Sequence, residues 1–412
     1  MKSNFKHITA LLLFVMFFIA PSCIEKFIPD LGDFEPSRLI VVEGQITDEE
    51  GPFRVKISKA FEIDNMQLYP PPVNGADVQI FDDKGNHYQL YSTVEGWYET
   101  ENKQLKGIAG NTYTLNITTE DGSQFESSPV FMLDVPDIGK LYFEESQIER
   151  LEDLEVVRET RLDILLDAKD TKGETEYWKW DFEETWEVRT PKDSVRIPVQ
   201  PDDALGFIIV ANVEFKDGNL SRNWDNKKER CWVTVPSTTI LIESTDKKSV
   251  DEVEKFPINS ISPKGDRLHI KYSILAKQTA LSEEMYNFWK RLREANEEVG
   301  SMFDKTPSQI FGNIQCCNGK QKALGYFSAS AVKNKRIFIN PSEHDVETMD
   351  AYSGCLYNFY IPRVANYYLG HIVSVGDPNY ASAVGQKIYS TEPWCADCRE
   401  YGTSVKPDFW ED

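Results

Sequence analysis

Cys395 and Cys398, in the run CADC near the end of the chain, are the pair of residues whose spacing most directly suggests chemistry. Such a pair can act as a redox dithiol or supply half of a zinc site. A redox pair normally opens a helix, whereas this one is followed by the loop-like run REYGTSVKPDFW. A zinc site needs a second ligand pair, and His371 has no nearby His or Cys to provide one. We therefore predict structural disulfides here.

The start of the chain reads as an export signal. A basic head with Lys2 and Lys6 precedes an apolar run over residues 8–20, which is too short to span a bilayer. Small residues at positions 20–22 then lead into Cys23. This arrangement resembles a bacterial lipobox, in which the cysteine thiol is acylated and becomes the new N-terminus. The alternative is an ordinary signal peptide cleaved near Ala20, which leaves Cys23 as a free thiol.

Two short segments follow from this interpretation. Residues 1–22 are predicted to be a lipoprotein signal peptide that is removed. Residues 23–36 carry two prolines and little regular pattern, so we predict a tether between the lipid and the fold.

Export also decides how the other cysteines are interpreted. An oxidising compartment favours disulfides, and six cysteines remain once Cys23 is set aside, an even number. All six come after residue 230, so only the C-terminal part is expected to be cross-linked. The pairing stays open among the candidates, which are Cys231, Cys316, Cys317, Cys355, Cys395 and Cys398.

Length and charge bound the remaining possibilities. A chain of 412 residues exceeds one ordinary core and indicates two domains, or three. The formal net charge is −22, and a surface this acidic repels phosphate backbones, so no nucleic-acid partner is expected. Such a high net negative charge typically serves to keep a protein soluble.

Short strand patterns dominate the first third of the chain. They alternate apolar with polar residues and are separated by turn sequences such as EEGP, DDKGN and EDG. Their number and spacing predict an immunoglobulin-like or transthyretin-like β-sandwich over residues 37–135. The clearest patterns are LIVVEGQIT (39–47), FRVKISK (53–59), ADVQIF (76–81), HYQLYS (87–92) and TYTLNITT (112–119).

A boundary with Pro136 and Gly139 precedes a second run of strands, so residues 136–412 are predicted to form a larger, disulfide-containing, β-rich domain. One amphipathic helix is expected at about 282–299, with Ser282 as its N-cap and Gly300 at its end. The fold class is therefore mainly β. The aromatic stripe of this helix is expected to pack into the core rather than to line a groove.

Motifs for catalysis are missing from the sequence. There is no G-x-S-x-G, H-E-x-x-H, phosphate loop or dinucleotide fingerprint. The segments DDKGN (82–86) and DAKDTKGETE (167–176) resemble oxygen-ligand loops, but neither has the spacing of a calcium loop, and β-turns explain both. We therefore expect no enzyme activity, no cofactor and no metal ligand.

Several segments together carry a family resemblance. They are Cys23, LIVVEGQITDEEGPFRVKIS, PPPVNGADVQI, GWYET with GNTYTLNI, CWVTV, YNFWKRL, SMFDKTPSQIFGNI, ALGYFSAS and CADCREYGTSVKPDFW. In this order they resemble a family of Bacteroidota lipoproteins that carry a domain of unknown function. The resemblance implies a lipid-anchored protein of the outer membrane, at its periplasmic or its outer face, often encoded beside a TonB-dependent receptor. It implies no catalytic residue.

The expected function follows from this resemblance. The chain is predicted to be a non-enzymatic accessory or binding component associated with a TonB-dependent receptor in nutrient uptake, held in the bilayer by acylated Cys23. Two alternatives remain open. One is a cell-surface polymer hydrolase, and the other is a structural or adhesive lipoprotein without a transport role.

Overall fold

The computed structural model describes residues 39–61, 69–101, 103–152, 155–189, 230–297, 310–319, 321–353 and 398–412, together with the strands of a third sheet defined below. The predicted signal peptide and tether, including Cys23, lie outside the described residues. Among the residues that are described, no helix has both the length and the apolar character needed to cross a membrane.

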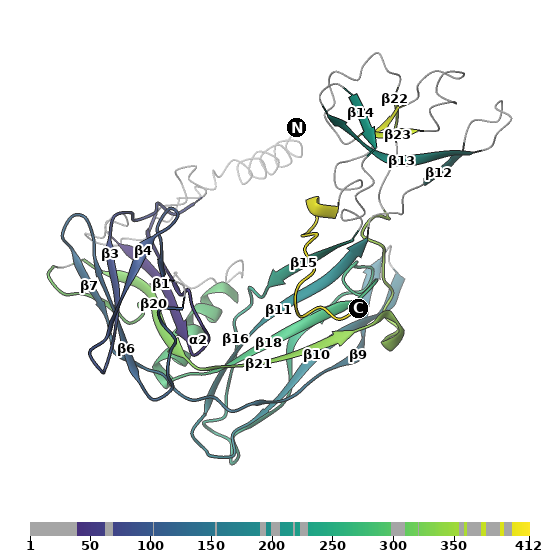
Figure 1. Cartoon of the computed structure of the whole chain (residues 1–412). Coiled ribbons are helices and arrows are strands. Elements are labelled where there is room, and N and C mark those ends of the chain that lie inside the picture. The colour runs from purple at the N-terminus through teal and green to yellow at the C-terminus, as the bar shows by residue number, and fades with distance from the viewer. Residues whose placement is uncertain are drawn as a thin grey trace, which may run out of the picture.

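The first body is one ten-stranded sheet with the order β19-β7-β6-β3-β4-β5-β2-β1-β20, and β8 pairs with β6 (Figure 1). Its strands alternate buried and exposed side chains as the sequence predicts, because successive residues of a strand point to opposite faces. The strands are β1 (Ile40–Thr47), β2 (Arg54–Lys59), β3 (Asp77–Asp82), β4 (His87–Ser92), β5 (Trp97–Thr100), β6 (Thr112–Thr118), β7 (Gln124–Ser127), β8 (Val130–Phe131), β19 (Ile314–Cys316) and β20 (Ala323–Ser330).

Strands β19 and β20 come from late in the sequence and nearly close this sheet. Strand β20 runs parallel to β1 from Ile40↔Ala323 to Thr47↔Ser330, and a bridge between Gln315 and Lys322 brings β19 beside it. Phe327 of β20 is fully buried in the core of the body. The prediction of a mainly β fold is confirmed, and the strands predicted within residues 37–135 form one nearly closed sheet with β19 and β20. Local periodicity cannot reveal partners that arrive so much later in the chain.

Gly325 allows β20 to lie this close to β1. Its φ is +91°, and a Cβ built on it would lie 1.9 Å from the Val42 carbonyl oxygen. We expect Gly325→Ala to lose at least about 2 kcal/mol of unfolding free energy in urea titrations, from left-handed strain plus a backbone clash. Gly85→Ala is the matched control, since its φ is +85° with nothing within 4 Å, and it is expected to lose only about 1 kcal/mol. Equal losses would contradict the close approach.

The second body is a sandwich of two antiparallel sheets. One has the order β17-β10-β9, and the other has the order β15-β11-β18-β21 with β16 also pairing with β11. Trp178 and Trp180 are fully buried between them, and Trp180 contacts Phe256 of the opposite sheet at a ring distance of 4.4 Å. The strands are β9 (Ile138–Glu152), β10 (Glu155–Lys169), β11 (Tyr177–Arg189), β15 (Arg230–Pro236), β16 (Leu241–Ser244), β17 (Glu252–Ile261), β18 (Tyr272–Ala280) and β21 (Val332–Ile339).

Helix α2 (Glu283–Glu297) matches the predicted helix to within two residues at its described end. The Ser282 hydroxyl accepts a hydrogen bond from the Met285 N–H at 3.2 Å, which confirms the predicted N-cap. Met285 and Phe288 are buried, and Phe288 contacts Tyr326 of β20 at a ring distance of 4.9 Å. The aromatic stripe therefore packs between the two bodies, as core packing predicts.

The joint between the two bodies is held by direct contacts. The chain passes from β20 through buried Ala331 into β21, and the Val332 N–H donates to Asp48 at 2.8 Å. The Gln278 side-chain amide donates to the Pro136 carbonyl at 2.7 Å. These bonds, with the helix contacts, fix the angle at which the two bodies meet (Figure 1).

A third sheet projects from the far end of the second body (Figure 1). Its order is β12-β13-β23-β24-β22, with β14 pairing with β13. Two stretches that are far apart in the sequence supply its strands, which are β12 (Val195–Pro198), β13 (Phe207–Lys216), β14 (Asn219–Arg222), β22 (Asn358–Tyr360), β23 (Ile372–Val375) and β24 (Ile388–Ser390).

Candidate functional site at the base of the third sheet

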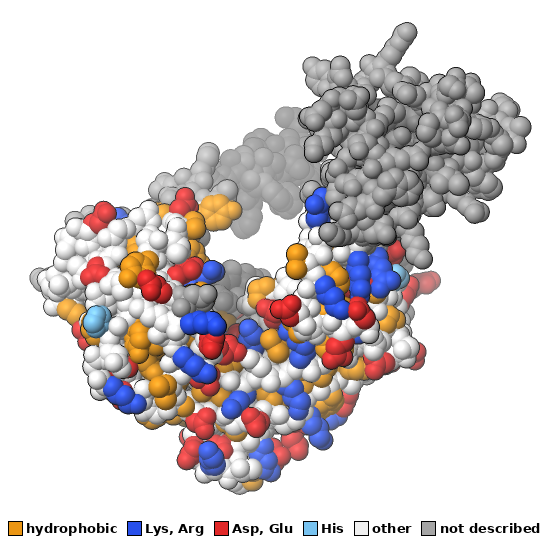
Figure 2. All heavy atoms as spheres, viewed as in Figure 1, with side chains coloured by type: hydrophobic (Ala, Val, Ile, Leu, Met, Phe, Trp, Pro, Cys, Tyr) orange, Lys and Arg blue, Asp and Glu red, His pale blue; other side chains and the backbone are white. Residues whose placement is uncertain are grey.

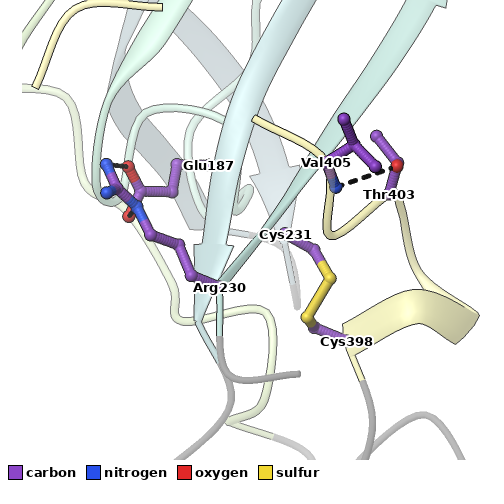
Figure 3. Close-up of a disulfide and its surroundings, with 6 residues drawn as sticks. All are labelled: Glu187, Arg230, Cys231, Cys398, Thr403 and Val405. Carbon is purple, nitrogen blue, oxygen red and sulfur yellow. Dashed lines mark hydrogen bonds and ion pairs between the residues drawn. A yellow bond between two sulfur atoms is a disulfide. The ribbon is translucent and has the colours of Figure 1, made fainter. Parts of the chain in front are cut away.

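The chain crosses between the second body and the third sheet beside a disulfide. Strand β11 leads out at Arg189, and the chain returns at the start of β15 with Arg230 and Cys231. It later returns again at Cys398, which opens a short 3-10 helix, Cys398–Glu400. Cys231 and Cys398 are bonded, with Cα atoms 5.6 Å apart and a sequence separation of 167 (Figure 3). The bond therefore ties together the two points at which the chain comes back from the third sheet.

The disulfide resolves part of the cysteine prediction. Cys398 is bonded to Cys231 and not to its neighbour in the CADC run, and both sulfurs belong to fully buried residues. Cys355 and Cys395 lie outside the described residues. Nothing in the spacing of the cysteines could have identified Cys231 as the partner, because topology brings the two residues together.

Cys316 and Cys317 correct the expectation that all six cysteines pair, since both are free thiols in the structure. They lie at the end of β19 in the first body, whereas Cys231 and Cys398 lie in the second. Cys316 is the last residue of β19, and Cys317 follows it in a bend. Their position thus separates them from the disulfide at the base of the third sheet.

A buried carboxylate lies next to this disulfide. Glu187 is 2% exposed and accepts two hydrogen bonds from Arg230, each of 2.8 Å (Figure 3). It accepts a further hydrogen bond from Arg189. Burial alone raises the pKa of the Glu187 carboxyl, but the hydrogen bonds from Arg230 and Arg189 outweigh it, so the pKa lies below its usual value. Glu187 therefore joins the strand that leaves for the third sheet to the strand that returns from it.

This pKa shift makes the junction sensitive to acid. A carboxyl whose pKa is lower in the folded state adds stability above its unfolded pKa of about 4.3, and this is lost as pH falls through the folded value. We expect Glu187→Gln to cost about 3 kcal/mol at pH 7, with the gap from wild type shrinking below about pH 4. Urea titrations across pH 3–7 measure it. Glu149→Gln, an exposed pair with Arg158, is the control and should stay within about 0.5 kcal/mol. A gap independent of pH would contradict the ion-pair account.

The C-terminal tail closes over the same region. Thr403 and Trp232 exchange backbone hydrogen bonds of 2.9 and 2.8 Å, which adds a bridge at the edge of β15. Trp410 is 3% exposed, with its ring 6.3 Å from that of Trp232 and 5.7 Å from that of Phe338. Asp412 then accepts a hydrogen bond of 2.9 Å from Arg230. The tail is thus attached at its start by a disulfide, near its end by a buried ring, and at its last residue by an ion pair.

A second buried carboxylate lies between the two sheets of the sandwich. Glu184 is 4% exposed and accepts hydrogen bonds from Tyr272 at 3.0 Å, Asn259 at 3.1 Å and Arg267 at 3.2 Å. Burial and the Glu184 charge raise the pKa of the Tyr272 hydroxyl well above its usual value, so it stays a neutral donor. The sequence did contain a signal for this cluster, because Glu184 shares its strand parity with Trp178 and Trp180. Acid–base residue types are present here, but they satisfy one another inside the core.

The two loops that resemble calcium sites are turns, as predicted. Asp82 accepts backbone N–H bonds from Lys84 and Asn86 at 3.0 and 2.8 Å. Asp170 accepts three backbone N–H bonds of 2.7–2.8 Å, from the residues at positions 172, 174 and 175. Both carboxylates are therefore used to shape their own turns. Within the described part of the chain, no three His, Cys, Asp or Glu side chains gather as a metal site would require.

Comparison with known proteins gives one match. No curated protein and no solved structure matches the chain. A family model described as "Domain of unknown function (DUF4249)" matches residues 24–336, which is well over half of the sequence. The chain therefore belongs to the DUF4249 family.

Proposed function

We propose that this protein is an outer-membrane lipoprotein, anchored through acylated Cys23, that binds a TonB-dependent receptor or its cargo during nutrient uptake without turning over a substrate. The export signal and its terminal cysteine support the anchor, and the sequence resemblance to lipoproteins found beside such receptors supports the partner.

The structural observation that carries the proposal is how firmly the β bodies are held to one another. Helix α2 and the Asp48 bond fix the first body to the second, and the disulfide with Glu187 fixes the base of the third sheet. The first two bodies flank a hollow on the face shown in Figure 2. A preorganised surface of this kind loses little conformational entropy when it binds a large partner, which is what a non-catalytic accessory protein needs.

The tether sets how far this surface reaches from the membrane. Fifteen residues lie between Cys23 and Leu39, the first described residue, so sixteen Cα–Cα steps join the two. At no more than about 3.5 Å per residue, the first body lies within roughly 55 Å of an acylated Cys23. A membrane-embedded receptor is therefore within range.

The anchor and the partner need separate experiments. Labelling with a fatty-acid analogue should modify the wild type and fail in Cys23→Ser. Affinity capture from detergent-solubilised outer membranes should recover a TonB-dependent receptor in near-stoichiometric amounts, and less of it at high salt if charge steers the encounter. Capture of the protein alone in several mild detergents would instead support the structural or adhesive role. Equal labelling of wild type and Cys23→Ser would refute the anchor.

A further inference from the structure

The outer face of the first body carries a set of side chains whose chemistry suits one class of ligand. It is formed by the adjacent strands β3, β4, β5 and β2, and the register places its residues in facing pairs. We call this set the aromatic–amide face, and it comprises Asp77, Gln79, Gln89, Tyr91, Trp97, Glu99, Arg54 and Lys56.

Tyr91 is the most open aromatic ring of this face. It is 52% exposed and pairs with Glu99 on the adjacent strand. Leu90, the residue before it on β4, points to the opposite side of the sheet and is buried in the core. Trp97 points to the same side as Glu99, because the two are separated by one residue on β5. Lys56 lies over the Trp97 ring at 5.5 Å, so Tyr91 is the ring left open for stacking.

Planar amides lie next to this ring. Gln79 and Gln89 face each other across β3 and β4. Each donates its amide nitrogen to Asp77, at distances of 3.2 and 2.9 Å, so the carboxylate holds both amides in place. The face therefore combines one open aromatic ring with hydrogen-bonding groups whose positions are already fixed.

The charges of the face balance. It holds two carboxylates and two cations, and Arg54 pairs with Glu99 at 2.7 Å while Asp77 is occupied by the glutamines. On the side shown in Figure 2, charged side chains are sparser on the first body than on the second. The face therefore has no excess charge that would attract a charged partner. The net charge of the whole chain, −22, also repels anionic polymers. The complementary ligand is polar and uncharged.

We propose that the aromatic–amide face binds a neutral oligosaccharide. The apolar C–H face of a sugar ring stacks on an aromatic ring such as Tyr91, and its hydroxyls pair with amide and carboxylate groups beside that ring. Four strands at about 4.8 Å spacing give a surface roughly 15 Å wide, which accommodates a short run of sugar rings. A protein partner would instead favour a broader apolar centre than one open ring among amides. This inference goes beyond the receptor proposal and does not depend on it.

Binding to the purified mature chain with Cys23→Ser tests the inference. The probes are neutral hexasaccharides of glucose, mannose and xylose, with a hexamer of galacturonic acid as the anionic comparison, measured by titration calorimetry. At least one neutral probe is expected to bind with a Kd between about 10 μM and 1 mM, and more tightly than the anionic one.

Variants then locate the binding. Tyr91→Ala and Gln89→Ala should each weaken it about tenfold or more. Phe131→Ala is the matched control, because this ring is 53% exposed but lies away from the aromatic–amide face. Phe131 pairs with Thr112 at one end of β6, whereas Asp77 pairs with Thr118 at the other end. The control substitution should leave the Kd unchanged. The proposal is overturned if no neutral probe binds, if the anionic probe binds best, or if Tyr91→Ala and Gln89→Ala bind like the wild type. Because this assay contains no receptor, its failure leaves the receptor proposal standing.

Discussion

Replacing both Cys231 and Cys398 with serine is expected to lower the free energy of unfolding by about 2–5 kcal/mol. The bond closes a long loop, with the cysteines 167 residues apart, and cross-links over long loops remove the most conformational freedom from the unfolded chain. It also lies where Glu187 and Arg230 join β11 to β15, so its loss frees the base of the third sheet. Urea unfolding of wild type and variant under non-reducing conditions measures the effect.

The free cysteines supply the control for this experiment. Cys316 and Cys317 form no disulfide in the structure, so serine at both positions should change the unfolding free energy by less than about 0.5 kcal/mol. A reducing agent should then destabilise the wild type and the Cys316/Cys317 variant equally, and should destabilise the Cys231/Cys398 variant less than either. Insensitivity of the wild type to reduction would contradict the assigned bond.

Trp410→Ala is expected to cost about 3–5 kcal/mol, because it removes a large buried ring and leaves a cavity. Trp410 is 3% exposed and packs edge-on against both Trp232 and Phe338, on two different strands of one sheet. Its loss should also release the last residues of the chain, including the Asp412 bond to Arg230. Thermal unfolding combined with limited proteolysis of the C-terminal tail records both effects.

Val405→Ala is the matched change within the same tail. Val405 is 72% exposed, so its truncation should stay within about 0.5 kcal/mol and leave the tail resistant to protease. If Trp410→Ala behaves like Val405→Ala, the tail is not a stabilising element and its contacts have no energetic consequence.

Local features were predictable because their causes are local. The alternation in YWKWDFEETWEV places Trp178 and Trp180 in the core, the Ser282 cap starts α2, and Asp170 shapes its turn through hydrogen bonds to residues a few positions away. These signals act within one strand, one helix end or one turn, so the sequence alone contains them.

Long-range features escaped prediction because their causes are topological. The pairing of Cys231 with Cys398 and the closure of the first sheet by β20 depend on which segments meet in space. Glu187 shows the same limit, since its partner Arg230 lies on another strand, and Arg230 is bonded in turn to Asp412 near the end of the tail. The burial of Glu184 was easier to predict, because its position alternates in step with the core-facing tryptophans Trp178 and Trp180 on the same strand.

The parallel pairing of β1 with β20 also determines when the first body can be completed. Asp48 and Val332, which join the two bodies beside this pair, are 284 residues apart. A chain that emerges N-terminus first presents β1 long before β20, and the unpaired edge of β1 is then open to pairing with other chains. Closing such a distant contact is entropically slow, so folding of the first body depends on the last quarter of the chain. The first of the described strands to emerge is thus among the last to be protected, so we expect this protein to be prone to aggregation before β20 has emerged.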